Sequence, residues 1–290
     1  MIALRSANEP APLTAQEFTL FQRLILREAG IFLSDAKTAL LVGRLIRRVR
    51  ELELPTFGAY YARIASGDGA ELVRLLDAIA TNETHFFREP KQFELLEDRV
   101  CSEWLAQAAS GARARRVRVW SAACSTGEEP YSIAMVLLDR LGADWELEIM
   151  ASDLSTKVLD RAAQGVFPLA RAEEIPEHYR RRFMLRGIGP EEGNCRAGKA
   201  VRARVRFERI NLHEDEYPVT GMFDAIFCRN VLIYFDPPSR AQVIDRLTRR
   251  LVPGGYLFLG HAESAARSSV ELKAVMPAVY RRRALVAAVA

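Results

Sequence analysis

One short stretch, from Val117 to Met135, constrains the fold more than any other part of the chain. It begins with an apolar, β-branched run ending at Trp120, which is typical of a buried strand. The small residues Ser121–Gly127 follow, and helix-like apolar spacing resumes after Pro130. A strand, a tight turn and a helix in this order are typical of an open α/β sheet, in which a small-residue turn lets a nucleotide-like ligand approach the backbone.

Size and composition are those of a large protein with room for two domains. The chain has 290 residues, of which 49% are hydrophobic, so a sizeable core can be buried. It has no run of about 18 apolar residues, and its N-terminus lacks the basic-then-apolar order of a secretory signal. We therefore expect a cytoplasmic protein with no direct membrane insertion.

The cysteines and histidines do not follow a metal-binding pattern. None of the four cysteines belongs to a C-x-x-C pair, and the four histidines are scattered along the chain. We therefore expect no metal site, and free thiols suit a reducing compartment.

Helical and alternating patterns divide the chain into domains. The first residues carry two prolines and little pattern, whereas the pattern becomes helical at Thr14, which can form a capping box with Glu17. The predicted parts are a flexible tail (1–12), an all-α N-terminal domain (13–80), an interdomain segment that contributes to the active site (81–92), and a larger domain (93–290) with a small β-subdomain inserted at about 166–206.

Strand and helix patterns alternate in the larger domain. The strand candidates are Val117–Trp120, Glu146–Ala151, Val205–Ile210, Phe223–Phe227, Gly255–Gly260 and Val279–Arg282. Helical spacing separates most of them, over Tyr131–Leu141, Ser155–Gln164 and Arg240–Leu251. This alternation predicts a doubly wound, mostly parallel α/β sheet.

The inserted segment is strongly basic. Between Arg180 and Ile210 there are ten basic and three acidic residues, a net charge of +7 in a chain whose total is +4. Near its end, apolar residues alternate with Arg202, Arg204 and Arg206, which predicts an antiparallel hairpin with a solvated basic face. Such a face is suited to an acidic partner, and covering the sheet edge is the alternative interpretation.

A second basic face is predicted in the all-α domain. On the helix expected over Lys37–Glu51, Arg44, Arg47 and Arg48 lie on one side. They could meet acidic helices of a partner, and an ordinary solvated surface is an equally good interpretation.

The turn after Trp120 carries neither G-x-G-x-x-G nor the Walker pattern, so it favours neither a dinucleotide nor a nucleoside triphosphate. Asp153 follows the next predicted strand, where a carboxylate can accept both hydroxyls of a ribose. A helix end, Pro253-Gly254-Gly255 and a further strand complete the pattern. In this order the features resemble class I S-adenosylmethionine-dependent methyltransferases.

Longer blocks narrow the resemblance to the CheR-type chemotaxis receptor methyltransferases. The blocks are Thr81–Glu89, Trp120–Ser132, Ala151–Asp153, Phe223–Asp236 and Gly260–Ser264. The resemblance covers nearly the whole chain. It implies a protein-glutamate O-methyltransferase, which transfers methyl groups from S-adenosyl-L-methionine to glutamate side chains of methyl-accepting chemoreceptors and releases S-adenosyl-L-homocysteine.

The resemblance also implies site residues. Arg88 and Tyr234 are expected to border the methyl-transfer position as catalytic residues. The residues expected to bind the cofactor are Asn82, Thr84, Arg88, Glu129, Asp153, Asn211, Leu212, Arg229 and Asn230. Glu129 is favoured over its neighbour Glu128, but spacing alone does not separate the two.

The expected chemistry needs no general base, because a glutamate carboxylate with a pKa of about 4.3 is already ionised at neutral pH. The expected partners are receptor cytoplasmic helices and a receptor C-terminal peptide at the β-subdomain, and the enzyme is expected to be a monomer. A nucleic-acid methyltransferase is an alternative suggested by the basic insertion, although Ser239 follows Asp236-Pro237-Pro238 where such enzymes commonly have an aromatic residue. A catalytically silent, cofactor-sensing scaffold is another.

Overall fold

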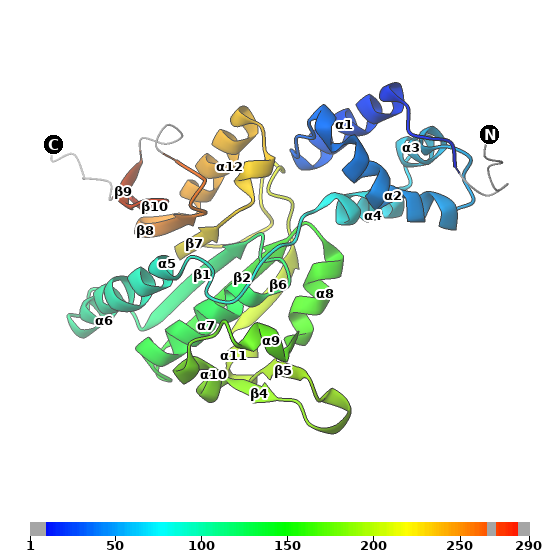
Figure 1. The fold of residues 1–290 in the computed structure, drawn as a ribbon. Coiled ribbons are helices and arrows are strands. Elements are labelled where there is room, and N and C mark those ends of the chain that lie inside the picture. The colour runs from blue at the N-terminus through cyan, green and yellow to red at the C-terminus, as the bar shows by residue number, and fades with distance from the viewer. Residues whose placement is uncertain (1–9, 266–270, 284–290) are drawn as a thin grey trace, which may run out of the picture. The chain divides into compact units, whose positions relative to one another are not determined.

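A computed structural model describes residues 10–265 and 271–283 of the chain, which forms two compact units (Figure 1). The first unit holds the described residues up to Thr81 together with Tyr234–Ser239, and the second holds Asn82–Ile233 and the described residues from Arg240 onward. Residues 1–9 of the predicted tail lie outside the described part.

The first unit is helical, as predicted. Its elements are α1 (Ala15–Ala29), the 3₁₀ turn η1 (Asp35–Lys37), α2 (Thr38–Glu51), α3 (Phe57–Ala65) and α4 (Gly69–Ile79). Thr14 and Glu17 form the predicted capping box of α1, and Gly30 ends this helix in the left-handed conformation. The apolar sides of the helices meet in one core that includes Phe21, Leu45 and Tyr60.

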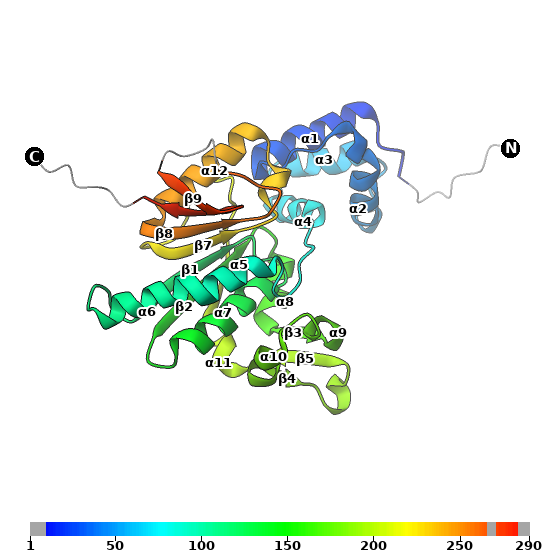
Figure 2. The same ribbon diagram turned by 60° about the vertical axis from the view of Figure 1, so that its left-hand side comes forward.

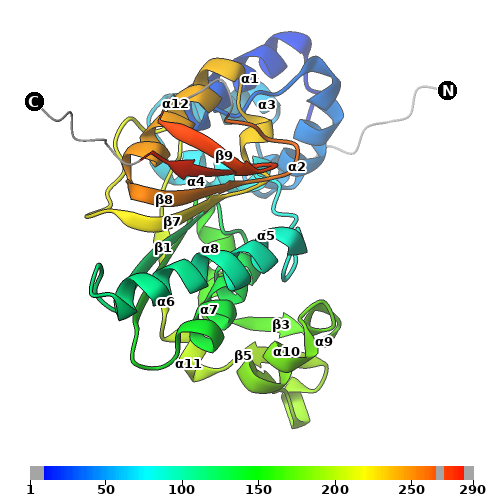
Figure 3. The same ribbon diagram turned by 90° about the vertical axis from the view of Figure 1, so that its left-hand side faces the viewer.

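The second unit contains a seven-stranded sheet, and Figure 3 shows its strands β9, β8, β7 and β1 one above the other. Its strands are β1 (Arg116–Ala122), β2 (Glu146–Asp153), β6 (Val205–Arg209), β7 (Phe223–Cys228), β8 (Leu251–Leu259), β9 (Leu272–Met276) and β10 (Val279–Arg282). The order is β6-β2-β1-β7-β8-β10-β9. Strands β6 to β8 in this order are parallel, and β10 and β9 are antiparallel to their neighbours. The predicted doubly wound, mostly parallel sheet is confirmed.

Helices cover this sheet on both faces. They are α5 (Pro90–Leu95), the π turn η2 (Leu96–Val100), α6 (Cys101–Ala109), α7 (Glu128–Leu141), α8 (Thr156–Gln164) and α12 (Pro237–Arg249). The crossovers from β1 to β2 and from β7 to β8 run in opposite directions along the sheet, so right-handed connections place α7 and α12 on opposite faces. The order therefore reverses between β1 and β7, where α/β sheets bind ligands.

A smaller antiparallel sheet is inserted between α8 and β6 (Figure 2). Its order is β3-β5-β4. The inserted elements are β3 (Val166–Pro168), α9 (Leu169–Ala172), α10 (Glu177–Phe183), β4 (Met184–Arg186), the 3₁₀ turn η3 (Gly189–Glu191), β5 (Asn194–Ala197) and α11 (Lys199–Arg202). We call residues 166–202 the inserted subdomain.

The hairpin predicted at the end of the insertion is not present in this small sheet. The alternating run of Arg202, Arg204 and Arg206 is not a hairpin strand of the insertion: Arg202 ends helix α11, and Arg206 lies on β6, the edge of the main sheet. Parallel pairing of β6 with β2 explains the two-residue period, because an edge strand half-exposed to solvent has the same pattern.

The strand after the last predicted helix begins earlier than expected. Helix α12 ends at Arg249, and Pro253-Gly254-Gly255 lies within β8 rather than before it. The pairing with β7 shifts register between Phe223 and Ala225, so the Pro-Gly-Gly stretch forms a bulge. Strand β9 was not predicted.

Candidate functional site

The carboxyl ends of the parallel strands bring most of the predicted site residues together. The turn Ala122–Gly127, which we call the cofactor loop, follows β1, and Asp153 ends β2. Asn211 and Leu212 come after β6, and Arg229 with Asn230 comes directly after β7. Strands β1 and β7 flank the point where the strand order reverses, β2 lies next to β1, and β6 is the edge strand beyond β2.

The cofactor loop has an unusual backbone that Asp153 holds in place. Ala123, Ser125 and Gly127 all have positive φ, of 69°, 50° and 98°. For the two non-glycine residues this conformation costs on the order of 1–3 kcal/mol each. Asp153 Oδ2 accepts the Ser125 N–H at 2.9 Å, and its Oδ1 accepts the Ser155 N–H at 3.0 Å. The carboxylate thus links the ends of β1 and β2.

Gly127 is needed for both conformation and space. Besides its positive φ, a Cβ at this position would lie 2.9 Å from the Cβ of Ala162 in α8. A side chain here would push the start of α7 away from its neighbour, so the small-residue turn is required by packing as well as by any ligand.

Glu129, in the first turn of α7, is buried beside Arg229. Its Oε2 lies 3.1 Å from Arg229 Nε, and its Oε1 accepts the hydroxyl of Ser121 at 2.7 Å. Burial raises the pKa of Glu129, and the Arg229 charge and the Ser121 hydrogen bond oppose this rise. Glu129 is therefore a buried carboxyl group held at the end of β1.

The neighbouring Glu128 has different partners. Its side chain is buried and accepts the Thr126 hydroxyl at 2.6 Å within the cofactor loop. Burial raises the pKa of Glu128 as well. Glu128 therefore supports the loop, whereas Glu129 contacts Arg229 across the strand ends.

Three predicted residues lie in the Asn82–Glu89 segment. The Asn82 carbonyl accepts the Ser125 hydroxyl at 3.1 Å, and the Thr84 carbonyl accepts a hydrogen bond from Arg171 at 2.7 Å. Arg88 donates to the Glu83 carbonyl at 2.9 Å. Among the described residues, no carboxylate pairs with Arg88, so it is not the helix-capping ion pair that its neighbours Glu89 and Glu94 could have formed.

Arg229 and Asn230 bind this segment to the end of β7. The buried Arg229 guanidinium donates to the Arg88 carbonyl. Asn230, with φ of 58°, donates its side-chain amide to Glu89 Oε1 at 3.2 Å and its backbone N–H to Glu263 Oε2 at 3.0 Å. Backbone and side chain of Asn230 are thus both fixed.

Two carboxylates of this network were missed by the sequence interpretation. Glu89 Oε1 accepts the His261 N–H at 3.0 Å, and Glu263 Oε2 accepts the Gly260 N–H at 2.6 Å. Both residues lie inside the blocks that carried the family resemblance, but their roles depend on contacts between distant segments. A Cβ on Gly260 would lie 2.7 Å from the Asn230 N, so this strand end also requires glycine.

Asn211 and Leu212 lie beyond the edge strand β6. Asn211 Oδ1 accepts the His213 N–H at 3.0 Å, which forms a local turn. Leu212 is buried and its carbonyl accepts the Tyr217 hydroxyl at 3.0 Å. An apolar side chain and a fixed turn are therefore present at this end of the sheet.

Tyr234 belongs to a different unit. It ends the 3₁₀ turn η4 (Leu232–Tyr234) and groups with the helical unit, where its carbonyl accepts the Phe32 N–H at 2.8 Å. Asp236 accepts the Ser239 N–H at 2.8 Å, so Asp236-Pro237-Pro238 starts helix α12. This local role accounts for the residues that suggested a base-binding motif.

Comparison with known sequences identifies the family. The description "CheR methyltransferase, SAM binding domain" matches residues 82–280, and "CheR methyltransferase, all-alpha domain" matches residues 16–80. This chain belongs to the CheR methyltransferase family.

Curated relatives agree over almost their whole length. The chain is 41% identical over 274 residues to chemotaxis protein methyltransferase 2 of Pseudomonas aeruginosa, which covers 94% of this chain and 95% of the relative. It is 41% identical over 256 residues to the chemotaxis protein methyltransferase of Salmonella typhimurium, covering 87% and 85% of the two chains. The corresponding Escherichia coli protein is 40% identical over 263 residues, covering 90% and 88%.

The CheR site has the chemistry that S-adenosylmethionine requires. The cofactor carries a sulfonium and an ammonium group, a ribose and a carboxylate. Carboxylates dominate the strand ends, and among the described residues the buried Oε2 of Glu89 and the hydroxyl of Ser155 accept or donate no hydrogen bond. Arg229 supplies a buried positive charge. A cationic, hydroxyl-bearing cofactor therefore fits these residues.

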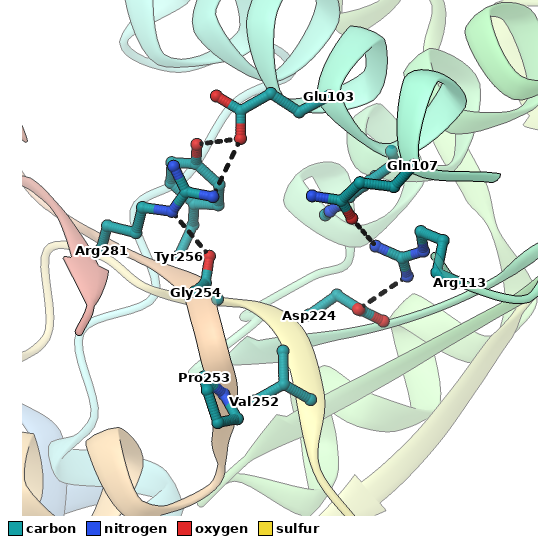
Figure 4. A pocket seen from close by; sticks show the side chains of 11 residues that line it. Glu103, Gln107, Arg113, Asp224, Val252, Pro253, Gly254, Tyr256 and Arg281 are labelled. Carbon is teal, nitrogen blue, oxygen red and sulfur yellow. Dashed lines mark hydrogen bonds and ion pairs between the residues drawn. The ribbon is translucent and has the colours of Figure 1, made fainter. Parts of the chain in front are cut away.

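A separate cavity lies at the opposite end of the CheR sheet. It has a volume of about 250 Å³ and is lined by the start of β7, the bulge of β8 and α6 (Figure 4). Its charged groups already pair with one another: Arg113 with Asp224 at 2.8 Å, and Arg281 with Glu103 at 3.2 Å. Because its charges are paired and it faces away from the strand ends, we assign no ligand to it.

Neither a metal site nor a membrane span is found in the part of the chain that the structure describes. No cluster of three or more potential metal ligands occurs among residues 10–265 and 271–283. Within the same ranges, no helix is long and apolar enough to cross a membrane.

Proposed function

We propose that this protein methylates glutamate side chains of chemoreceptors, forming γ-methyl esters with S-adenosylmethionine as donor. Membership of the CheR family supports the reaction class. The single observation that carries the cofactor site is the pair of hydrogen bonds from Ser125 and Ser155 to Asp153, which fixes a carboxylate at the end of β2, one strand from the strand-order reversal. In this proposal the enzyme is a cytoplasmic monomer acting on receptor cytoplasmic helices.

Each cofactor residue has a proposed task. When bound, the cofactor supplies a methyl group activated by a positive sulfur. Asp153 accepts the ribose hydroxyls, and Glu129 with Arg229 holds the charged amino-acid end. Leu212 and Asn211 border the adenine. Asn82, Thr84 and Asn230 close the site from the segments next to it.

The proposed catalytic residues orient the acceptor. A glutamate carboxylate is nucleophilic without losing a proton, so the protein has to partly desolvate it and point one oxygen at the methyl carbon. Arg88 can hold that carboxylate through its planar fork, and the Tyr234 hydroxyl can donate a hydrogen bond to it. Positioning of this kind can supply up to about 7–11 kcal/mol.

The parts of the chain divide the work in this proposal. Residues 13–80 approach the receptor helices, and residues 81–92 bring Arg88 to the cofactor domain at 93–290. On α2, only part of the predicted basic face is free for docking. Arg47 is 88% exposed, whereas Arg48 pairs with the buried Glu71.

Arg44 is likewise used inside the helical unit. Its guanidinium donates to the carbonyls of Ala78, Ile79 and Ala80 at the end of α4, at 2.5–3.0 Å. Any docking of acidic receptor helices by this face therefore depends on Arg47 and not on all three arginines.

We further propose that the free edge of β4 takes an extended receptor C-terminal peptide as an added strand. Strand β4 pairs on one side with β5 and ends the small sheet on the other. Leu185 is 58% exposed and Ile188 is 83% exposed, and Arg186 is exposed beside them. A β-edge with apolar and basic side chains suits an extended acidic tail. Tethering would raise the local enzyme concentration to about millimolar.

Peptide titration tests this docking site. We expect receptor C-terminal peptides to bind the native protein and to bind Arg186→Glu more weakly. Arg206→Glu is the matched control, because Arg206 lies on β6 of the main sheet. Absence of binding by the native protein to any receptor tail would refute docking, and equal binding by Arg186→Glu would place it elsewhere.

A methyl-transfer assay separates the candidate functions. Methyl-labelled S-adenosylmethionine is offered with receptor-bearing membranes or with RNA, and the product is treated with mild base. We expect label in the receptor that is released as methanol, because carboxyl methyl esters are base-labile. Label in RNA would favour the nucleic-acid alternative, and cofactor binding without transfer would favour a silent scaffold.

A further inference from the structure

The Asn82–Glu89 segment has no regular secondary structure to hold it. Phe87 and Glu89 have positive φ of 51° and 61°, and residues 86–89 form a turn and a bend. Its carbonyls therefore depend on partners from other parts of the chain. One side of the segment contacts the cofactor domain, where Ser125 donates to the Asn82 carbonyl and the Phe87 N–H donates to Ser132 Oγ at 3.1 Å.

The other side of the segment contacts the inserted subdomain. Arg171 of α9 donates to the Thr84 carbonyl at 2.7 Å. The rings of Phe86 and Phe167 lie 4.8 Å apart, and Phe87 stacks on Tyr179 at 5.3 Å. Among the described residues, the insertion thus contributes one hydrogen bond and two aromatic contacts to the segment that carries the proposed cofactor residues, and its Glu174 lies 3.9 Å from His85 Nδ1.

Arg171 lies on a helix that is held to the rest of the insertion, and its side chain extends away from it. Helix α9 is held there because the Leu169 N–H donates to the Gly193 carbonyl at 2.7 Å. The Arg171 side chain reaches out of the insertion to Thr84 and is exposed. Its charge also acts on Glu128, where it opposes the rise in pKa that burial causes. One guanidinium therefore binds the segment and also influences the start of α7 electrostatically.

We propose that Arg171 is a positioning residue for S-adenosylmethionine binding. By holding the Thr84 carbonyl it keeps Asn82 and Thr84 against the cofactor loop before the cofactor arrives, which lowers the ordering cost of binding. This inference rests on the proposed cofactor roles of Asn82 and Thr84. It gives the inserted subdomain a task inside the cofactor site, separate from receptor docking.

The test compares variants by cofactor titration and steady-state kinetics. Arg171→Gln should raise the Kd and KM for S-adenosylmethionine roughly tenfold, because a charged donor to a carbonyl is lost. The turnover at saturating cofactor should stay within roughly twofold, since bound cofactor then orders the segment. Arg171→Lys keeps a charged donor and should restore most of the affinity.

Arg196→Gln is the matched control. Arg196 is also an exposed arginine of the insertion that donates to a carbonyl, that of Gln164 at 3.2 Å, and the described contacts include none between Arg196 and the Asn82–Glu89 segment. We expect its cofactor affinity to equal that of the native protein. Amide exchange over residues 82–89 should accelerate in Arg171→Gln and remain native in Arg196→Gln.

The outcomes separate this inference from the proposed cofactor site. If Asp153→Ala weakens cofactor binding but Arg171→Gln leaves Kd and KM native, the positioning role is wrong and the site stands. An affinity loss shared equally by Arg171→Gln, Arg171→Lys and Arg196→Gln would also overturn the role, because general loosening of the insertion would explain it. If Asp153→Ala binds normally, the site assignment itself fails.

Discussion

At the scale of single residues, buried carboxyl groups give the strand ends their electrostatic character. Glu129, Glu263 and Asp153 are all buried there, and Arg229 is the buried guanidinium beside them. Backbone N–H groups stabilise two of these carboxylates directly, at Asp153 and Glu263. Such a site favours a cationic ligand, because a positive charge offsets the cost of burying these groups.

Asp153 provides the first residue-scale prediction. Asp153→Ala should weaken S-adenosylmethionine binding by about 1.5–3 kcal/mol, since it removes the proposed ribose acceptor and frees the Ser125 N–H. Asp153→Asn keeps the shape of the side chain and one acceptor oxygen, so it should lose less binding free energy than Asp153→Ala. Calorimetry measures both, with the exposed Asp160→Ala of α8 as control. Native affinity in Asp153→Ala would place the cofactor elsewhere.

Arg88 should matter for turnover more than for folding. Arg88→Ala is expected to cost about 2–4 kcal/mol of transition-state stabilisation, because the acceptor carboxylate loses its charged partner. Arg88→Lys should recover little of the lost turnover if the planar guanidinium is needed to hold the acceptor carboxylate. Steady-state rates and melting temperatures are compared with Arg161→Ala, an exposed arginine of α8. Near-native turnover by a folded Arg88→Ala protein contradicts the catalytic role.

Glu129 predicts how cofactor affinity depends on pH. Because burial raises its pKa above the usual 4.5, Glu129 takes up a proton before an ordinary glutamate does as pH falls. A cationic cofactor prefers the carboxylate, so its affinity should fall as pH drops through this window. For the same reason, ionised Glu129 destabilises the protein without cofactor at pH values above the raised pKa of Glu129.

Binding titrations against pH test this dependence without the receptor, whose own carboxylates titrate nearby. Glu129→Gln should flatten the dependence of cofactor affinity on pH. Glu128→Gln should leave this dependence unchanged, because Glu128 pairs with Thr126 in the loop. The reverse result would assign the cofactor contact to Glu128, and an unchanged profile in both variants would exclude either carboxylate.

At the scale of elements, strand ends were the most predictable part of the structure. β-branched runs and small-residue turns identified β1, β2 and β7, and with them the place of Asp153 and Arg229. The strand predicted over Val205–Ile210 is present as β6 of the main sheet, but the hairpin predicted from the alternating arginines is not, because an edge strand and a solvated hairpin share a two-residue period. The partners of Glu89 and Glu263 could not be predicted, since they come from segments far away in sequence.

Helix α2 also carries a residue whose partners could not be predicted from the sequence, and this residue gives a prediction at the scale of elements. Arg44 looks like a surface residue in the sequence, yet it caps the last carbonyls of α4. Arg44→Ala should therefore destabilise the helical unit by about 1–3 kcal/mol. Arg47→Ala should cost under about 0.5 kcal/mol, because its pair with Glu51 is exposed.

Urea unfolding of the full chain, followed by helical signal, measures this difference. Equal stability of the two variants would show that the carbonyl contacts of Arg44 contribute nothing. Arg47→Glu then tests receptor docking without unfolding the helices, by its effect on methylation rate and on the salt dependence of that rate.

At the scale of the whole molecule, the chain combines a helical unit, a cofactor-binding sheet and an inserted subdomain. The family assignment covers both units, through residues 16–80 and 82–280. The inserted subdomain contacts the Asn82–Glu89 segment through Arg171 and also presents the free edge of β4. In our account, receptor capture and cofactor ordering therefore share one insertion.

Mass mapping of a receptor after methylation tests this account most directly. The cytoplasmic part of a chemoreceptor is incubated with the protein and S-adenosylmethionine, digested, and examined for peptides heavier by one methylene. We predict gains confined to glutamate side chains, reversed by mild base, and absent with Arg88→Ala. Methylation at lysine, or at receptor glutamates to the same extent with Arg88→Ala, would contradict the proposed reaction at this site.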